Sequence, residues 1–276
     1  MTTLIIGGSG FLGSELVRQA TEAGHATAAT YATKPGDTST ASWHHLDLRD
    51  PWLVDAVLAE VRPRVVINVS SGAADWAITA QGPVRLAMAA AKHGIRLVHV
   101  SSDAVFSGSR VHYDESSLPD PITPYGAAKA AAETGVLAVH PEPVVARTSL
   151  IIGHGRSAHE QTVYQLAAGT RDGALFTDDI RCPVHVGDLA AALLELAFQD
   201  AAAGIHHIAG ADAVSRYELG LLIAGRDGLD ASSLPAGRRA DSILPGALDV
   251  RLDSRATQRK LHTTLRGVRQ FCTAPA

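Results

Sequence analysis

The sequence has little of what marks a secreted, membrane-bound or nucleic-acid-binding protein. Its two cysteines, Cys182 and Cys272, are too few for a disulfide framework and indicate a reducing cytoplasm. A formal net charge of -4 argues against nucleic acid and anionic membranes as partners. No apolar run approaches a membrane span, and we expect no signal peptide. Adjacent histidines such as His206-His207 point in different directions, so we expect no metal site.

What the 276 residues do contain is an alternation of short apolar strands with longer helical segments. Strands are expected at 3–6, 25–31, 64–68, 95–101, 144–149 and 204–210. Helices are expected at 11–23, 52–61, 76–93, 125–137, 160–169 and 187–198, with a weak one near 255–266. In the segment 76–93, Gly82-Pro83 must interrupt the helix or mark its true start. This alternation predicts an α/β fold with a Rossmann-type, doubly wound parallel sheet. Residues 1–150 would form that domain, completed by parts of 187–210, with 151–186 and 211–276 as a smaller substrate-binding region.

A glycine loop follows the first strand and leads directly into a helix. Gly7 suits a tight turn, Gly10 has no side chain to keep a pyrophosphate from the backbone, and Gly13 lets helix and strand pack closely. The helix N-terminus then points its N–H groups at the phosphates. An ordinary glycine-rich turn is the alternative, but the strand–turn–helix context favours a dinucleotide site.

Three further side chains suggest carbonyl chemistry. Tyr125 and Lys129 lie four residues apart, so they share one face of the expected helix. A neighbouring ammonium favours the phenolate and eases proton transfer to or from a carbonyl oxygen. Ser102 ends a strand at the edge where a doubly wound sheet binds its ligand. Each feature alone could be structural, but the three in this order predict an enzyme.

With these motifs the chain resembles an extended short-chain dehydrogenase/reductase of the epimerase/dehydratase superfamily. Within that superfamily it is most similar to the dTDP-4-dehydrorhamnose reductase branch. The pieces that carry the resemblance are Gly7 to Gly13, Asp47-Leu48, the segments 62–68 and 101–108, Pro124-Tyr125-Gly126 with Lys129, Arg147-Thr148-Ser149, Pro183 with 187–190, and 204–210.

The resemblance implies roles for individual residues. Ser102 and Tyr125 would hold the substrate carbonyl, with Tyr125 as proton donor and Lys129 on the nicotinamide ribose. The implied cofactor-binding residues are Gly7, Gly10, Phe11, Leu12 and Gly13 at the pyrophosphate, Asp47 and Leu48 at the adenine, and Asn68, Val69 and Ser70 beneath the cofactor. Asp103, Arg147 and Arg181 would face the substrate.

The end of the second expected strand favours NADPH over NADH as the cofactor, and NADH stays an alternative. Enzymes that prefer NAD usually place an acidic residue there for the ribose 2′-hydroxyl. Here Thr33 and Lys34 follow the strand and could meet a 2′-phosphate, although Lys34 could equally be a solvated loop lysine. The resemblance further implies a small-molecule partner, most simply a nucleotide sugar such as a 4-keto-6-deoxy sugar nucleotide. It also leaves a homodimer open.

Departures from the family pattern cluster on the substrate side. Ala104 stands where a tyrosine is usual, Val69 to Gly72 replaces an alanine-rich run, and the segment after Asp178 lacks the usual glutamine and glycine. The tryptophan usual near the C-terminus is also absent.

A reductase of a sugar nucleotide or related biosynthetic ketone remains the main hypothesis. The alternatives are a sugar-nucleotide epimerase and a non-catalytic regulatory subunit resembling that of methionine adenosyltransferase.

Overall fold

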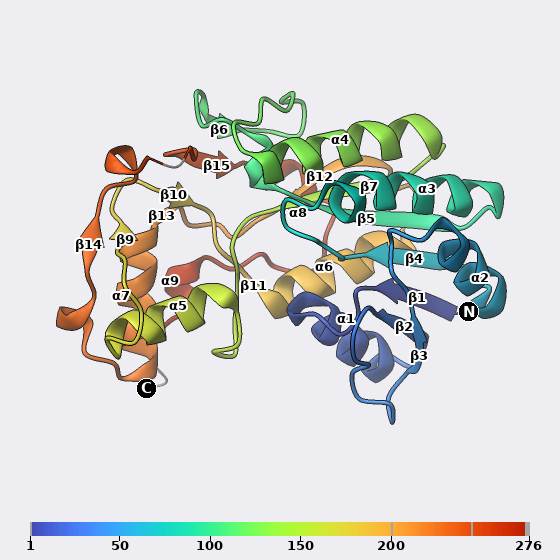
Figure 1. Ribbon diagram of the computed structural model, residues 1–276, viewed down its shortest axis with the longest axis horizontal. Coiled ribbons are helices and arrows are strands. Elements are labelled where there is room, and N and C mark those ends of the chain that lie inside the picture. The colour runs from blue at the N-terminus through green and yellow to red at the C-terminus, as the bar shows by residue number, and fades with distance from the viewer. Residues whose placement is uncertain (1, 200, 244, 274–276) are drawn as a thin grey trace.

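A seven-stranded parallel sheet forms the centre of the computed structural model, which describes residues 2–199, 201–243 and 245–273 (Figure 1). The strand order is β3 (Ser42–His45), β2 (Ala26–Tyr31), β1 (Thr2–Ile6), β4 (Val65–Asn68), β5 (Arg96–Ser102), β7 (Val144–Thr148) and β12 (Gly204–Ile208). The order reverses between β1 and β4, where doubly wound sheets bind ligands. The Rossmann-type α/β fold expected from the sequence is therefore confirmed.

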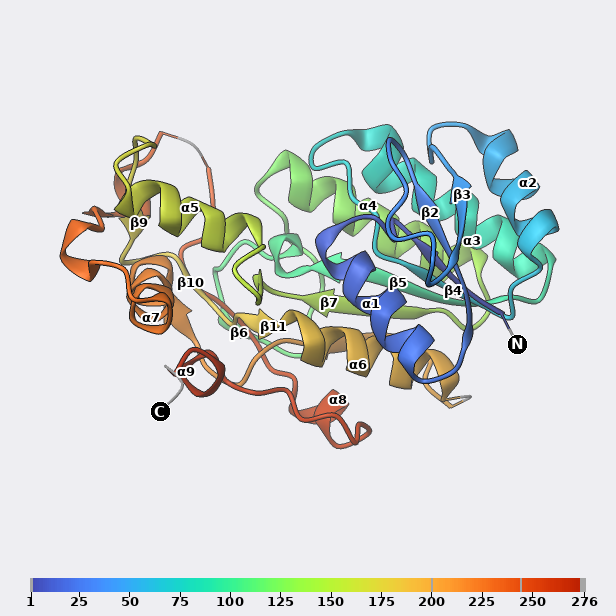
Figure 2. The same ribbon diagram turned by 90° about the horizontal axis from the view of Figure 1, so that it is seen from below.

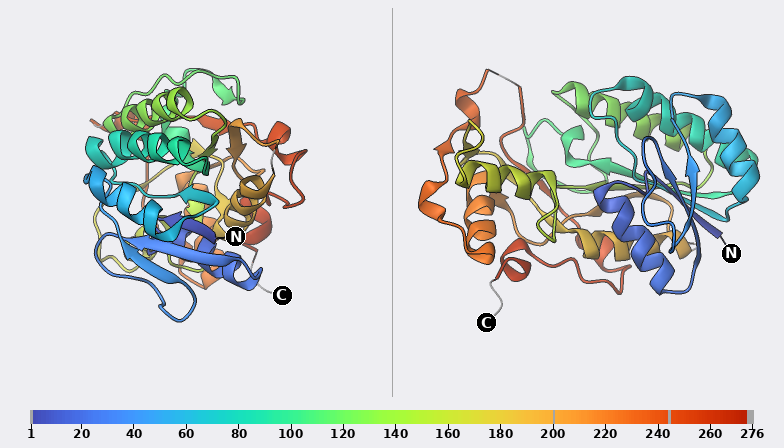
Figure 3. Two further views of the ribbon diagram at one scale, coloured as in Figure 1. Left: turned by 90° about the vertical axis from the view of Figure 1, so that its right-hand side faces the viewer. Right: turned by 60° about the horizontal axis from the view of Figure 1, so that its bottom comes forward.

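Helices cover both faces of the sheet because its strands are apolar on both sides. On one face lie α1 (Phe11–Glu22) and α6 (Val186–Phe198), which run side by side (Figure 2). On the other lie α2 (Pro51–Val61), α3 (Gly82–Lys92) and α4 (Pro124–Val139), so the sheet is a middle layer (Figure 3). In β1, Ile5 packs into the first core while Leu4 and Ile6 pack into the second, as the alternation of a strand requires.

Two local expectations need correction, and a third gains detail. The edge strand β3 was missed, because its Trp-His-His residues lack the β-branched pattern of a strand and follow a long polar loop. The segment 76–93 is helical as expected, and at Gly82, where the Gly-Pro pair predicts a break or a start, a π-helix, η1 (Ala77–Gln81), gives way to α3. The weak helix near 255–266 is a single turn, α8 (Arg255–Gln258), followed by another short one, α9 (Val268–Phe271).

A third, smaller apolar core lies beyond the sheet's carboxyl edge. It is built mainly from α5 (Ala158–Ala167) and α7 (Arg216–Asp227), with β9 (Leu175–Phe176) beside them. Short pairs complete this part: β10 (Ile180–Arg181) with β13 (Val214–Ser215), β11 (Val184–His185) with β8 (Ile151–Ile152), β14 (Ala236–Gly237) with β9, and β15 (Val250–Leu252) with β6 (Val111–Tyr113). The 3-10 turns are η2 (Asp103–Val105), η3 (Ala231–Ser233) and η4 (Arg239–Asp241). The division near residue 150 stays a prediction.

Candidate active site

The glycine loop has the shape that a dinucleotide phosphate requires. Gly7 has a φ of +82°, and its N–H donates to Thr30 Oγ1 at 3.0 Å. A Cβ on Gly13 would lie 2.1 Å from the Gly7 carbonyl oxygen, so only glycine fits this approach of α1 to the loop. Gly10 caps α1 without a side-chain hydrogen bond, and no acidic residue occupies the first turn. The N–H groups of this turn are therefore oriented for an anion.

A close helix contact brings Tyr125 to the end of β5. Thr123 caps α4 by accepting from the Gly126 N–H, and Pro124 is its first residue. A Cβ on Gly126 would lie 2.0 Å from the Ala104 carbonyl oxygen, so this glycine lets α4 approach the turn η2. Ser102 caps that turn through the Ala104 N–H at 3.2 Å. The Tyr125 hydroxyl consequently faces the hydroxyls of Ser102 and Ser71.

The environment keeps Tyr125 protonated. Burial raises the pKa of its phenol, and the charge of Asp103 adds to this, while hydrogen bonds with Ser102 and Ser71 act in the opposite direction. Desolvation of the phenolate is the largest of these effects, and the tuning of Tyr125 by the Lys129 ammonium stays a prediction. A neutral phenol is the form that can give a proton to a carbonyl oxygen.

Lys129 lies one helical turn beyond Tyr125 and is completely enclosed. Its ammonium donates to the Val100 carbonyl oxygen at 3.0 Å. Burial lowers the pKa of Lys129 to about 8, and the negative charge of Glu133 partly offsets that effect. The cation is therefore held near the end of β5, and Lys129 lines one cleft with Phe11 and Leu12 of α1.

That cleft has a volume of about 500 Å³ and unites several of the expected site residues. The expected residues that line it are Phe11, Leu12, Val69, Ser102, Asp103, Tyr125, Lys129 and Arg181. Further polar residues that the sequence analysis did not assign also line it, among them Ser71, Ser149, His159 and Arg216. The Ser215–Glu218 capping pattern marks Arg216 as the start of a helix, but nothing local indicates that the helix faces the cleft.

Arg147 does not line the cleft, contrary to the expectation that it faces substrate. Its side chain is fully buried, and its guanidinium forms an ion pair with Glu133 at 2.8 Å. It also donates to the Ser117 carbonyl oxygen and lies over the Phe106 ring. Strand β7 alternates its side chains, and Arg147 falls on the α4 side of the sheet rather than at its end. This arginine therefore holds helix and strand together.

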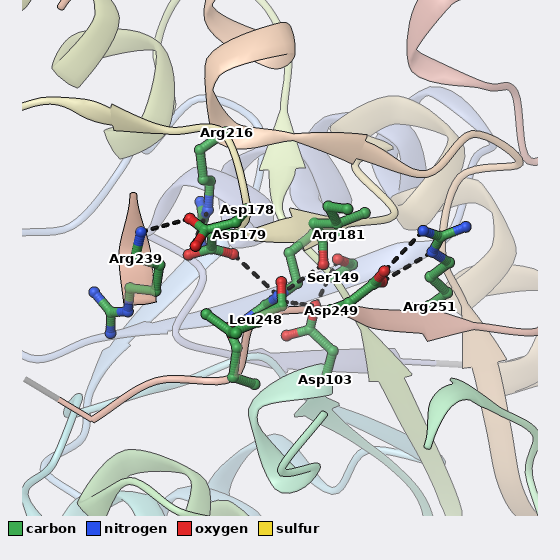
Figure 4. Close-up of polar contacts among 12 residues, drawn as sticks. Asp103, Ser149, Asp178, Asp179, Arg181, Arg216, Arg239, Leu248, Asp249 and Arg251 are labelled. Atoms are coloured by element: carbon green, nitrogen blue, oxygen red, sulfur yellow. Dashed lines mark hydrogen bonds and ion pairs between the residues drawn. The ribbon is translucent and has the colours of Figure 1, made fainter. Parts of the chain in front are cut away.

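Asp103 and Arg181 lie at the cleft, but their polar groups are engaged within the chain. Asp103 accepts from Ser149 Oγ at 2.6 Å, and Arg181 Nε lies 3.7 Å from the same carboxylate (Figure 4). The Arg181 guanidinium also donates to the carbonyl oxygens of Ala247 and Leu248 and faces Asp179 at 3.0 Å. Arg181 thereby ties the turn η2 to the segment of Ala247 and Leu248.

The remaining expected cofactor residues follow the strands β2, β3 and β4. Asn68 is buried, and its side-chain oxygen accepts from the N–H and hydroxyl of Ser70, which shapes the loop beside Gly7. Leu48 is buried in the sheet core, and Asp47 pairs with Arg49 at 2.6 Å. Thr33 and Lys34 are exposed just past β2. Their contacts with a cofactor stay predictions.

Two absences complete the description of the site. In residues 2–199, 201–243 and 245–273, no group of three or more His, Cys, Asp or Glu side chains is arranged to hold a metal ion. In the same ranges no helix combines the length and apolarity needed to cross a membrane.

Comparison with known protein families assigns the chain to one of them. The family model described as "RmlD substrate binding domain" matches residues 1–270. The chain belongs to the RmlD substrate binding domain family. Because the match spans nearly the whole sequence, both the sheet and the smaller region of this RmlD family member are covered by it.

Individual relatives support the same assignment to the RmlD family. The dTDP-4-dehydrorhamnose reductase of Mycobacterium tuberculosis is 33% identical, covering 78% of this chain and 71% of its own. The probable low-salt glycan biosynthesis reductase Agl14 of Haloferax volcanii is 29% identical, covering 90% and 87%. Among solved structures, dTDP-4-dehydrorhamnose reductase of Bacillus anthracis in complex with NADP superposes with a TM-score of 0.82 at 22% identity, covering 98% and 96%.

Proposed function

We propose that this protein is an NADPH-dependent reductase of a ketone on a nucleotide sugar, most simply a 4-keto-6-deoxy sugar nucleotide. The observation that carries the proposal is that Ser102, Tyr125 and Lys129 line one cleft with the first residues of α1. The relatives with reductase names, one of which was solved with NADP, add support. The expected cytoplasmic location and homodimer stay predictions.

The chain's own groups suit ketone reduction. NADPH, when bound against the glycine loop, supplies the hydride. Tyr125, kept as a neutral phenol by its burial, gives its proton to the carbonyl oxygen. The hydroxyl of Ser102 orients that oxygen. The buried Lys129 ammonium binds the ribose, and its positive charge offsets the negative charge that Tyr125 carries once its proton has left. The apolar walls of Leu12, Val100 and Leu150 keep water from the reacting atoms.

The preference for NADPH rests on the end of β2. After Tyr31 the chain continues through Ala32, Thr33 and Lys34, with no carboxylate to accept the ribose 2′-hydroxyl of NADH. Asp37, the first acid that follows, accepts hydrogen bonds from Ser39 instead. Titration with both cofactors tests this preference. Tighter binding of NADH, or unchanged NADPH affinity in Lys34→Ala, would contradict it.

The central test removes the transferable proton. Tyr125→Phe keeps the ring and its packing but deletes the hydroxyl, so turnover of a 4-keto nucleotide sugar should fall about a hundred- to ten-thousand-fold. Cofactor affinity should stay near that of the parent. The measurement is the loss of NADPH absorbance with substrate, alongside fluorescence titration of NADPH.

A matched variant controls for the loss of a tyrosine hydroxyl elsewhere. Tyr164 on α5 bonds to Asp227 outside the cleft, so Tyr164→Phe should keep parental turnover. Near-normal turnover in Tyr125→Phe would remove Tyr125 as the acid. Interconversion of sugar epimers without net NADPH consumption would favour the epimerase. A parent that turns over no ketone, with a cellular role that survives Tyr125→Phe, would favour the regulatory subunit.

A further inference from the structure

His99 is a fully buried histidine that the proposed mechanism does not use. It lies on β5 opposite Asn68, the last residue of β4, because the parallel register pairs these two positions (Figure 1). Both side chains are 0% exposed, and Nδ2 of Asn68 lies 3.2 Å from Nδ1 of His99. The next residue on each strand, Val69 and Val100, lines the cleft. The contact between His99 and Asn68 therefore lies one residue behind the cleft wall.

A backbone donor fixes the orientation of the Asn68 amide. The N–H of Ser70 donates to the side-chain oxygen of Asn68 at 3.1 Å, and the Ser70 hydroxyl donates to the same oxygen at 2.6 Å. Because an N–H cannot accept a hydrogen bond, the NH₂ group of Asn68 could not take the place of that oxygen. The NH₂ group consequently faces His99 and donates to Nδ1 of the ring.

This contact requires a neutral His99 with its proton on Nε2. Since an NH₂ group only donates, a protonated ring would place two donors against each other. Burial and the nearby charge of Lys129 lower the pKa of His99 well below its usual range, which keeps the ring neutral. Nε2 has no hydrogen-bond partner in the described part of the chain, and a buried N–H without a partner costs free energy. What the imidazole adds over an apolar side chain is thus the acceptor at Nδ1.

The Asn68 amide shapes the loop that follows it, and this loop touches both halves of the site. A Cβ on Gly7 would lie 3.0 Å from Ser70 Cα, so the backbone of Ser70 lies directly against the glycine loop. The next residue, Ser71, lines the cleft and shares a hydrogen bond with the Tyr125 hydroxyl. The position of Ser70 therefore limits the space at Gly7 that a dinucleotide can use.

We propose that His99 is a positioning residue for the dinucleotide cofactor. Acting through Asn68, it holds the backbone of Ser70 against the glycine loop, so the cofactor meets a preformed wall. Without an acceptor at position 99, the Asn68 NH₂ group has no partner, and a reversed amide would set two donors against each other at Ser70. This role rests on the proposed function, because it requires that the cleft takes up NADPH.

The test removes the acceptor and then restores it. His99→Leu keeps a buried side chain without Nδ1, and NADPH affinity of the full chain should weaken about two- to tenfold, as expected for one lost hydrogen bond. His99→Asn places an oxygen close to the position of Nδ1 and should recover most of the parental affinity. Fluorescence titration measures both. In the cofactor-free protein, hydrogen–deuterium exchange of residues 68–72 should accelerate in His99→Leu but not in His99→Asn.

A double-mutant cycle tests whether His99 acts through Asn68. If it does, His99→Leu should cost little further NADPH affinity once Asn68→Ala has removed the amide, so the two losses should not add. Losses that add would show a general effect on the fold and would overturn the proposal. Urea unfolding of each variant measures the change in stability separately from the change in affinity.

His140→Leu is the matched control. This histidine is also buried, and its Nε2 lies 2.9 Å from the Ile95 carbonyl oxygen, next to the opposite end of β5. Its replacement should leave NADPH affinity and the exchange of residues 68–72 as in the parent. Parental NADPH affinity in His99→Leu would overturn the positioning role.

Turnover separates this role from the reductase. In an active reductase, His99→Leu should raise KM for NADPH far more than it lowers kcat, because His99 touches no reacting atom. If the parent reduces a 4-keto nucleotide sugar while His99→Leu keeps parental NADPH affinity, the positioning role fails and the reductase stands. If NADPH affinity needs His99 but the parent reduces no ketone, the positioning role stands and the reductase fails.

Discussion

Burial is the force that decides the protonation of the individual site residues. It raises the pKa of Tyr125, lowers that of Lys129 to about 8 and lowers that of His159 to about 4. In each case the shift favours the neutral form, because a charge loses hydration on entering the cleft wall. Tyr125 and His159 are thereby kept as neutral donors at pH 7, while burial brings the pKa of Lys129 to about 8.

The lowered pKa of Lys129 predicts a rise in stability with pH. Below about pH 8 the ammonium is charged in both folded and unfolded chains, so its burial cost is fully present. Between about pH 8 and 10.5 the folded protein releases the proton while the unfolded chain keeps it, and this cost is relieved. The unfolding free energy of the parent should therefore rise relative to that of Lys129→Met over this interval, as measured by urea titration without cofactor.

Lys92→Met provides the comparison at an exposed lysine. It lies at the end of α3 and should show no such trend relative to the parent. A parent-to-Lys129→Met difference that stays flat between pH 8 and 10.5 would contradict the lowered pKa of Lys129.

At the scale of elements, the position of α4 depends on a buried ion pair. Glu133 lies one turn beyond Lys129 and accepts from Arg147 on β7 and from Ser101 on β5. The side chains of Glu133 and Arg147 are 2% and 0% exposed, so both charges are removed from water. One pair thus joins the helix of Tyr125 and Lys129 to two strands of the sheet.

Removing one partner should cost far more than removing both. Glu133→Ala leaves the Arg147 guanidinium buried without a carboxylate, and the free energy of unfolding should fall by about 3–5 kcal/mol. The double variant Glu133→Leu with Arg147→Met replaces both charges by apolar groups and should lose less than the single variant. Urea unfolding at pH 7 measures both.

The exposed pair Arg18–Glu22 on α1 is the control for this experiment. Its side chains are 51% and 63% exposed, so Glu22→Ala should cost no more than about 1 kcal/mol. Equal losses for Glu22→Ala and Glu133→Ala would show that the buried pair has no special weight.

At the scale of the whole molecule, a late segment of the chain joins helix α6 on the sheet to the smaller core of α5 and α7. Arg266 donates to Asp188 at the start of α6 through its side chain and its N–H, and Glu195 on the same helix accepts from Thr263. Just beyond, Val268 packs into the smaller core of α5 and α7. The segment therefore bridges the sheet and the substrate side.

Breaking this attachment should loosen the segment locally. Asp188→Ala removes an acceptor of several hydrogen bonds from Arg266, each to a charged group, and backbone exchange in 259–271 should accelerate about tenfold to hundredfold. Exchange in α4 should stay as in the parent. Hydrogen–deuterium exchange read by mass spectrometry measures both, with Asp55→Ala on the exposed side of α2 as control. Acceleration of α4 to the same extent would mean global destabilisation rather than local release.

Patterns that are local in the chain were enough to predict much of this protein. Three such patterns are the glycine loop, the alternation of strands and helices, and the Tyr125–Lys129 spacing. Each depends on residues that are close in the chain, so its physical requirements can be inferred from the sequence. The same reasoning missed β3, because an edge strand half covered by a loop carries no strong apolar pattern. It also extended the helix at 255–266, where only one turn forms.

Long-range packing decided the rest. Whether Arg147 faces substrate or Glu133 depends on which side of β7 meets α4, and the pKa of Tyr125 depends on how deeply the fold encloses it. His159 and Arg216 stand 57 positions apart, and only the approach of α5 to α7 brings them into hydrogen-bond contact at the edge of the cleft. The sequence by itself determined the fold and singled out the residues proposed for proton transfer, because those signals are short-range. Only the tertiary structure decided which charges are buried together, because desolvation and pairing act between segments distant in the chain.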